Sequence, residues 1–265
     1  MRILTPLQAL SAAAALALLA GCSGGSAIAP NPSTPRGFIP MTMGGIVAPV
    51  GQLPQPNAII ADVPLGSDSR FAVLAGSTVT NSGPTIVTSN LGLSPGSAVT
   101  GFPPGIVKDG KIHAGDIHAA QAQLDLTTAY NNAAGRKNPT KVPADIGGMV
   151  IGPGLYKAPV SLAITGNLTL DGQNKKNGVF IFQVPSTLTT SVNSSITLIN
   201  MAKPCHIFWQ VGSSATLKTG SVFKGVILAQ ASISLGKGVS VEDGRLLARS
   251  GAVTLLRDIV TEPGP

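Results

Sequence analysis

The chain has 265 residues, 43% of them hydrophobic and 11% charged, with 32 glycines, 21 prolines and a formal net charge of +7. This hydrophobic content argues against a disordered chain. The lysines and arginines are scattered, form no basic helix and do not alternate with aromatic residues, so the sequence gives no support for nucleic-acid binding.

Residues 1–21 predict a bacterial lipoprotein signal peptide. An apolar run from Ala12 to Ala20 follows a short basic start and is too short to span a membrane. The segment Leu19-Ala20-Gly21-Cys22 resembles the site at which signal peptidase II cuts before a lipidated cysteine. We therefore expect lipidation of Cys22 and an exported, membrane-anchored protein; the alternative is an ordinary signal peptide cut elsewhere.

Residues 22–60 predict an extended tether, because a segment rich in proline and glycine cannot bury a core. Ser23 after the lipidated cysteine fits sorting to the outer membrane or the cell surface. The tether would hold one folded domain, residues 61–262, away from the membrane.

Residues 63–108 are rich in strand signals. Phe71-Ala-Val-Leu-Ala reads as a buried strand, whereas Ser77-Thr-Val-Thr and Thr85-Ile-Val-Thr alternate polar and apolar residues, as half-buried strands do. These segments predict the first coils of a β-rich domain.

Residues 115–134 predict the one long helix. Asp116 suits its first turn, and Gly135 suits its end. A lone helix of this length is marginal in water. We therefore expect it to pack on the rest of the domain, with Leu126 and Tyr130 buried.

Residues 164–257 carry an internal repeat. Pairs of a hydroxyl residue and leucine begin at residues 169, 187, 216, 234 and 254, so the successive spacings are 18, 29, 18 and 20. A period near twenty residues, built of short β-type runs between glycines and serines, indicates a solenoid.

The repeat also predicts which side chains face water. Successive side chains of a strand point to opposite faces. If Leu188, Leu217, Leu235 and Leu255 point into the coil, the hydroxyl residues before them point outward. Stacked strands then create a flat grid of small hydroxyls, with spacings of about 4.8 Å between strands and about 6.5–7 Å along each strand.

Several runs, in this order, closely resemble the microbial ice-binding (antifreeze) family. They are Phe71-Ala-Val-Leu-Ala-Gly, Ala129-Tyr-Asn-Asn-Ala-Ala-Gly-Arg, Gly178-Val-Phe-Ile-Phe-Gln, Ser186-Thr-Leu-Thr-Thr, Phe223-Lys-Gly-Val-Ile-Leu-Ala and Gly244-Arg-Leu-Leu-Ala. The resemblance covers roughly residues 60–260. It implies a mainly β fold, a right-handed, discontinuous β-solenoid of triangular section, with one long helix packed alongside. It also implies that residues 63–108 form the first coils, at the opposite end from the C-terminal coils, and that coils distant in sequence become neighbours.

The resemblance implies adsorption to ice through a flat face rich in threonine and serine. The matching positions are Thr187, Thr189, Thr190, Thr216, Thr219, Ser232, Ser234 and Thr254, which Thr165 and Thr169 would extend. Lys218, Lys237 and Arg257 either interrupt this grid, which predicts moderate or weak ice adhesion, or mark its edge. The alternative function is a structural or adhesive cell-surface solenoid that binds glycan or protein.

The residues give little support for catalysis, a metal site or a cofactor. A solenoid carbohydrate enzyme needs two carboxylates facing one groove, but the neighbours Glu242 and Asp243 read as a coil corner. His113 and His118 are not spaced for one helical face. Cys205 and His206 are adjacent, so in a strand they would point apart. We expect no enzyme, and we interpret Cys205 as a buried small residue without a disulfide partner.

Overall fold

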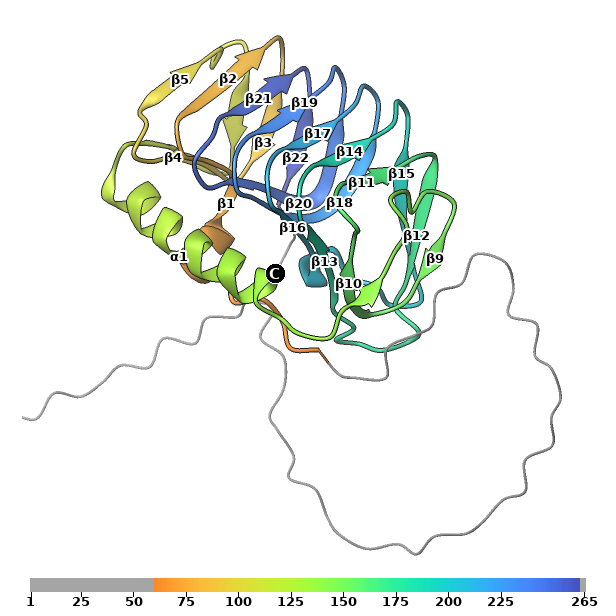
Figure 1. Cartoon of the computed structure of the whole chain (residues 1–265). Coiled ribbons are helices and arrows are strands. Elements are labelled where there is room, and N and C mark those ends of the chain that lie inside the picture. Colours follow the sequence, from red (N-terminus) through yellow and green to blue (C-terminus); the bar gives the residue numbers. More distant parts are fainter. Residues whose placement is uncertain (1–59, 263–265) are drawn as a thin grey trace, which may run out of the picture.

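The computed structural model describes residues 60–262. The predicted signal peptide, the tether up to residue 59 and Cys22 lie outside this range. The described chain forms a stack of coils in which the paired strands of residues 60–262 run parallel (Figure 1). A seven-stranded sheet makes one face of the stack, and a fifteen-stranded sheet bends around the other two faces.

The first part of the chain makes two coils and the helix. Its elements are η1 (Gly66–Arg70), β1 (Phe71–Ala75), β2 (Thr78–Ser82), β3 (Ile86–Thr88), β4 (Asn90–Leu93), β5 (Ala98–Thr100), β6 (Ile106–Lys108), β7 (Ile112–Ala114) and α1 (Ile117–Ala134). We refer to β1–β7 as the N-terminal coils.

The rest of the chain makes the larger part of the stack. Its elements are β8 (Thr140–Lys141), β9 (Val150–Ile151), β10 (Gly154–Lys157), β11 (Leu162–Ile164), β12 (Asn167–Asp171), β13 (Phe180–Val184), β14 (Leu188–Thr190), β15 (Ser195–Ile199), η2 (Pro204–His206), β16 (Ile207–Val211), β17 (Ala215–Leu217), β18 (Val222–Ala229), β19 (Ile233–Leu235), β20 (Ser240–Ala248), β21 (Val253–Leu256) and β22 (Ile259–Thr261). The mainly β, discontinuous solenoid with one helix alongside is thereby confirmed.

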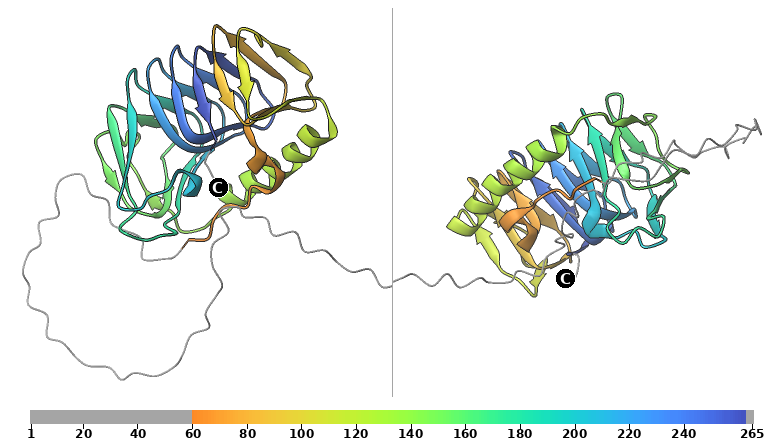
Figure 2. Two further views of the ribbon diagram at one scale, coloured as in Figure 1. Left: turned by 180° about the vertical axis from the view of Figure 1, so that it is seen from behind. Right: turned by 90° about the horizontal axis from the view of Figure 1, so that it is seen from below.

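The N-terminal coils lie directly on the last coil. β1 pairs with β20, β2 with β21 and β3 with β22, so the first and last coils are neighbours on all three faces. The expectation that they would lie at opposite ends was wrong, whereas the expectation that coils distant in sequence become neighbours is confirmed. Because α1 runs back along the stack, the chain restarts at the far end and returns to its first coil (Figures 1 and 2). We call this junction the seam.

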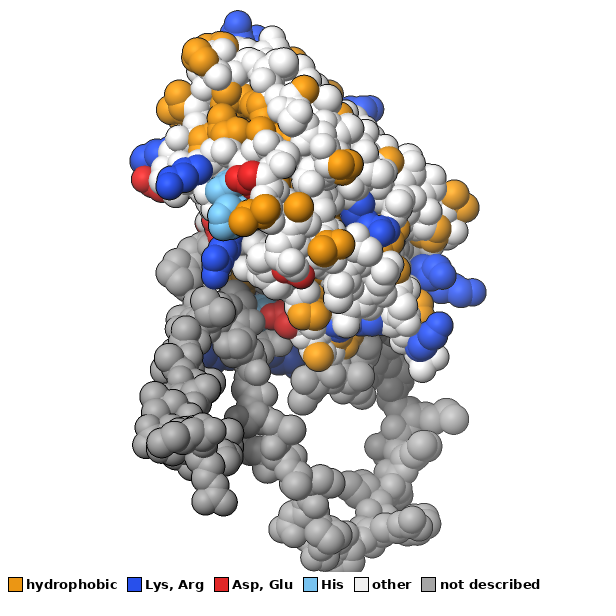
Figure 3. Space-filling model, turned by 90° about the vertical axis from the view of Figure 1, so that its left-hand side faces the viewer, with side chains coloured by type: hydrophobic (Ala, Val, Ile, Leu, Met, Phe, Trp, Pro, Cys, Tyr) orange, Lys and Arg blue, Asp and Glu red, His pale blue; other side chains and the backbone are white. Residues whose placement is uncertain are grey.

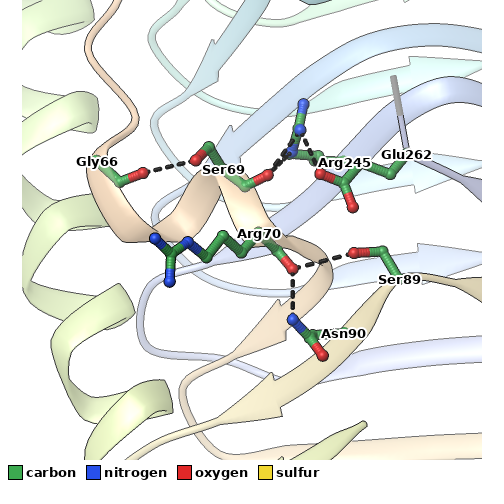
Figure 4. Close-up of polar contacts among 7 residues, drawn as sticks. All are labelled: Gly66, Ser69, Arg70, Ser89, Asn90, Arg245 and Glu262. Atoms are coloured by element: carbon green, nitrogen blue, oxygen red, sulfur yellow. Dashed lines mark hydrogen bonds and ion pairs between the residues drawn. The ribbon is translucent and has the colours of Figure 1, made fainter. Parts of the chain in front are cut away.

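Arg245 reinforces the seam from inside the protein. Its Nε and one terminal nitrogen donate to the carbonyl of Ser69 in η1 at 3.0 and 2.7 Å. The same terminal nitrogen lies 2.7 Å from a carboxylate oxygen of Glu262 (Figure 4). Arg245 is buried, so losing either partner would leave a buried charge poorly compensated. This contact ties the start of the last coil both to the end of the described chain and to the first coil.

The interior of the coils is apolar and includes an aromatic stack. Tyr156, Phe182 and Trp209 are register partners on β10, β13 and β16, with successive ring centroids 5.3 and 4.2 Å apart. The two polar tips also have partners: the Tyr156 hydroxyl donates to the Gly152 carbonyl, and the Trp209 indole donates to the Lys224 carbonyl. Large rings at the same inward position fill the coil interior and keep the coils aligned.

Helix α1 packs on the solenoid as predicted. Asp116 caps it by accepting from the Ala119 amide at 2.9 Å. Leu126 is fully buried, together with small alanines on the same side of the helix. Tyr130 is half-buried rather than buried, and the guanidinium of Arg249 lies 4.7 Å above its ring. Within residues 60–262 no helix is both long enough and apolar enough to cross a membrane.

Cys205 differs from the expectation. It is half-buried in η2 and is disulfide-bonded, rather than a buried residue with no disulfide. The neighbouring His206 is buried, and its Nδ1 lies 2.7 Å from a carboxylate oxygen of Asp62. This histidine therefore holds the incoming chain rather than acting with Cys205.

The free end of the N-terminal coils is partly apolar. Val99, Phe102 and Val107 form the last layer of the core and are only partly buried, whereas the next layer inward is fully buried. Figure 3 shows hydrophobic side chains gathered on this end of the molecule. Phe102, Ile106, Val107 and Ile112 line a shallow hollow there.

Candidate functional site

The seven-stranded sheet presents the most regular surface of the solenoid. Its strand order is β11-β14-β17-β19-β21-β2-β5. We call its outward side the seven-stranded face. Inward residues on these strands, such as Leu188, Ala215, Ile233 and Val253, are buried in the core, so the residues between them point to solvent.

One outward column crosses all seven strands. Register pairs join its members in the order Ala163, Thr189, Thr216, Ser234, Thr254, Thr80 and Thr100. Thr216, Thr254, Thr80 and Thr100 are exposed, and the other three are half-buried. Five threonines, one serine and one alanine thus stand side by side, about 4.8 Å apart from strand to strand.

A second outward column lies two residues earlier on each strand. By the same register and the backbone hydrogen bonds between coils, it contains Ser161, Thr187, Ser214, Ser232, Ala252, Thr78 and Ala98. The Thr187 hydroxyl donates to the Ser161 hydroxyl at 2.9 Å, which fixes both side chains. The face therefore carries two parallel rows of small side chains.

Neither column contains a charged residue. The ion pairs found among residues 60–262 involve His113–Asp116, His206–Asp62, Lys224–Glu242 and Arg245–Glu262, none of which is in either column. Lys218, Lys237 and Arg257 are exposed but lie in the turns after their strands. The cations therefore border the grid and do not interrupt it.

Six of the eight predicted positions lie on the two columns: Thr187, Thr189, Thr216, Ser232, Ser234 and Thr254. Thr187, however, is not in line with Thr216. The register pairs Leu188 with Ala215 and Thr189 with Thr216. Aligning the strands by their hydroxyl-leucine pairs would place Thr187 beside Thr216, two residues away from the observed register. This error arises because Ala215 and Leu217 both point inward, so either could be aligned with Leu188.

Two predicted positions do not lie on the grid. Thr190 is buried, and its hydroxyl accepts from the Lys218 amide at 2.8 Å and lies 3.1 Å from the Ser221 hydroxyl. Placing it on the outward face was wrong, because neighbours in a strand point to opposite sides and Thr189 points out. Thr219 is exposed but lies in the turn after β17.

The proposed extension through Thr165 and Thr169 also changes. Thr165 follows β11 and bonds to Asp145, and Thr169 is in β12, on another face. The grid extends instead through Thr78, Thr80 and Thr100 of the N-terminal coils. The alternation in Ser77-Thr-Val-Thr predicted that Thr78 and Thr80 point outward. It did not indicate which face of the solenoid they would join.

The polar residues considered for chemistry serve other contacts. His113 lies 2.7 Å from Asp116, and its ring meets that of His118 edge-on at 5.3 Å. In the described part of the chain, no three histidine, cysteine or acidic residues are placed to hold a metal ion. Glu242 on β20 is paired with Lys224, its register partner on β18.

Three comparisons bear on this arrangement. The ice-binding-like family model matches residues 73–261. The chain is 51% identical over 192 residues to an ice-binding protein of Nostoc sp. (strain HG1), covering 72% of this chain and 71% of that protein. It is 34% identical over 246 residues to an ice-binding protein of Colwellia sp, covering 85% and 92%.

The fold is also similar to that of a solved ice-binding protein. The crystal structure of an ice-binding protein from an Antarctic biological consortium superposes with a TM-score of 0.77 at 43% sequence identity, covering 80% of this chain and 96% of that chain.

Proposed function

Because the chain belongs to the ice-binding-like family, we propose that it adsorbs to ice through the seven-stranded face. The observation that carries this proposal is the pair of outward columns, uncharged and small across all seven strands. The named relatives and the solved neighbour support the same function.

The face suits a solid ligand for physical reasons. A solid offers many weak contacts in fixed positions, so only a large, flat and stiff surface can use them together. Threonine adds a hydroxyl that hydrogen-bonds water, a methyl group that orders the water beside it, and a branched Cβ that restricts χ1. The buried core beneath the columns keeps the strands from shifting relative to one another.

Charged side chains would hold their own hydration water and stand above the neighbouring threonines. Their position in the turns leaves the two columns free of such interruption. Weak adhesion was expected if Lys218, Lys237 and Arg257 interrupted the grid, and they lie beside it. We therefore infer that the whole face can approach a crystal.

The proposed activity is adsorption without catalysis. A carbohydrate-cleaving site would need two acidic residues that face one groove. Here Glu242 forms an ion pair with Lys224, and Glu262 forms one with Arg245, which supports adsorption without catalysis. The two glutamates thus serve as partners of cations.

We further propose that the protein is exported and held at the cell envelope by a lipid on Cys22, with residues 22–60 as a tether. The lipoprotein-like segment Leu19-Ala20-Gly21-Cys22 supports this localisation. In such an arrangement the face would meet ice outside the cell.

A growing single ice crystal tests the proposed function. In the presence of the purified protein, we expect a faceted crystal and uptake of the protein into the ice. A smooth disc with the protein rejected into the liquid would contradict ice adsorption and would favour the adhesive alternative, binding of glycan or protein.

A further inference from the structure

The seven-stranded face is assembled from two separate parts of the chain. β11, β14, β17, β19 and β21 come from the larger part, whereas β2 and β5 come from the N-terminal coils. The backbone connection between the parts runs through β7, α1 and β8. The level of β2 and β5 relative to the other five strands is therefore set by contacts across the seam.

A buried polar contact lies at the edge of the face on this seam. Asp258 is in the turn after β21, and Thr85 is in the matching turn after β2. Both side chains are fully buried. The backbone amide of Asp258 donates to the Thr85 hydroxyl at 3.1 Å, and the Asp258 carbonyl accepts from the Ile86 amide at 2.9 Å.

The Asp258 side chain extends the contact to a third coil. One carboxylate oxygen accepts from the Val239 amide at 2.9 Å, and the other accepts from the Leu256 amide at 2.6 Å. Asp258 therefore joins its own coil to the coil before it and, across the seam, to the first coil. A buried carboxylate with several backbone donors holds its position tightly, because a lost donor or acceptor inside the protein is costly.

Thr85 continues the chain of contacts away from the seam. Its carbonyl accepts at 2.9 Å from the amide of Ile106, the first residue of β6. The turns after β19, β21 and β2 are thus linked one to the next along the edge of the face, and the last of them is linked to the start of β6.

We propose that Asp258 and Thr85 are positioning residues that hold β2 and β5 level with the other five strands, so that the face contacts ice as one surface. This inference rests on the proposed function. Thr80 and Thr254 are register partners on the two sides of the seam, and a small tilt there would lift the N-terminal threonines away from a flat crystal.

The test combines Thr85→Val with one tyrosine on each side of the seam. Thr85→Val keeps the side-chain shape and removes the acceptor of the Asp258 amide. Thr80→Tyr places a protrusion on the N-terminal part of the face, and Thr216→Tyr places one on the larger part. Ice uptake of the purified full protein is measured for each tyrosine variant, both with Thr85 intact and in combination with Thr85→Val.

With Thr85 present, we expect both tyrosine variants to lower ice uptake several-fold. With Thr85→Val, uptake should already be lower, Thr80→Tyr should add little, and Thr216→Tyr should still remove most of what remains. Thr85→Ser, which retains the hydroxyl, should restore both the uptake and the effect of Thr80→Tyr.

The inference is overturned if Thr80→Tyr lowers uptake by the same factor with and without Thr85→Val, or if it has no effect in either. If neither tyrosine lowers uptake with Thr85 present, the proposed ice-contact face itself is contradicted. This outcome is distinguishable from a failure of the inference about Asp258 and Thr85 alone.

Hydrogen exchange in the unaltered protein provides a second test if Thr85→Val does not fold. The amides of Ile86 and Asp258 should exchange as slowly as those of Ala215 and Ile233 in the interior of the larger part, all four being hydrogen-bonded between coils. Much faster exchange at Ile86 and Asp258 would show that the seam opens readily and would overturn the inference.

Discussion

Leu124 and Leu126 lie two residues apart on α1 and on opposite sides of it. Leu126 is fully buried against the solenoid, and Leu124 is 65% exposed. The helix therefore packs through a narrow line of contacts that includes Leu126 and the small Ala122, Ala129 and Ala133.

This difference predicts unequal effects of two matched truncations. Leu126→Ala should lower the free energy of unfolding by about 2–4 kcal/mol, because it removes buried methyl groups and leaves a cavity. Leu124→Ala should change it by no more than about 0.5 kcal/mol, as for most surface substitutions. Urea unfolding of the two variants measures both values; equal losses would show that the helix does not pack through Leu126.

Thr216 is the best single position at which to test the ice-contact face. It is exposed in the middle of the first column, between Thr189 and Ser234. Thr216→Tyr should abolish crystal faceting, because a protruding ring holds the neighbouring threonines away from a flat solid. The melting temperature should stay the same, since the side chain faces solvent.

The matched control is Thr128→Tyr, which adds the same ring at an exposed threonine on α1. It should leave faceting and melting temperature unchanged. If Thr216→Tyr is folded and still shapes ice, the contact surface lies elsewhere, and the Ser195 and Thr197 strand on the third face becomes the next candidate.

The repeat was enough to predict the coil, the inward leucines and most of the hydroxyl positions. It was not enough to align the strands. Two longer connections, around Gln173 and around Met201, separate β12 from β13 and β15 from β16, so equal motifs do not imply equal register. The inward position of Thr190 does not depend on the register: it follows from the alternation of β14, because Thr189 points outward.

The resemblance implied that coils distant in sequence become neighbours, but it did not indicate which strands pair across the seam. Thr80 and Thr254 come from opposite ends of the described chain, and the pairing of β2 with β21 depends on α1 returning the chain along the stack. A single sequence carries the alternation of each strand but no record of its partner. The N-terminal part of the face therefore became visible only in the assembled structure.

Lipidation of Cys22 makes a chemical prediction about both cysteines of the chain. A thioether on the Cys22 sulfur and a disulfide with Cys205 exclude each other, because each uses the same sulfur atom. The chain has two cysteines, and Cys205 is disulfide-bonded in the structure, so lipidation of Cys22 requires a form of the protein without a disulfide between the two. Mass spectrometry of membrane fractions, without reduction, should find a chain that begins at a diacylated Cys22. A retained N-terminus, cleavage downstream of Cys22, or a peptide linking Cys22 to Cys205 would contradict lipidation.

The pH dependence of stability should report on Asp68. This residue in η1 is fully buried, and neither carboxylate oxygen has a hydrogen-bond partner among the described residues. Burial raises the pKa of Asp68 to about 8, although the charge of Arg245 lowers it, and the nearby Asp125 raises it further. In the unfolded chain the pKa of this carboxyl is close to its ordinary 3.8.

The sign of the effect follows from proton binding. Between pH 3.8 and about 8, the folded protein keeps a proton on Asp68 that the unfolded chain has lost. Raising the pH through this window therefore favours unfolding, by at most ~1.4 kcal/mol per pH unit from one group. This contribution of Asp68 to stability is full below the unfolded pKa and is lost as the pH approaches the folded pKa.

Asp68→Asn isolates this contribution, because the amide has nearly the same shape and does not titrate. Urea unfolding of the variant and of the unaltered protein, at steps across this window, should show two curves that diverge. The unaltered protein should lose stability relative to Asp68→Asn as the pH rises. Asp116 and Asp145, whose pKa values are lowered in the fold, are present in both proteins and cancel in the difference. Parallel curves would mean that Asp68 is already ionised in the folded protein, with its charge stabilised by Arg245.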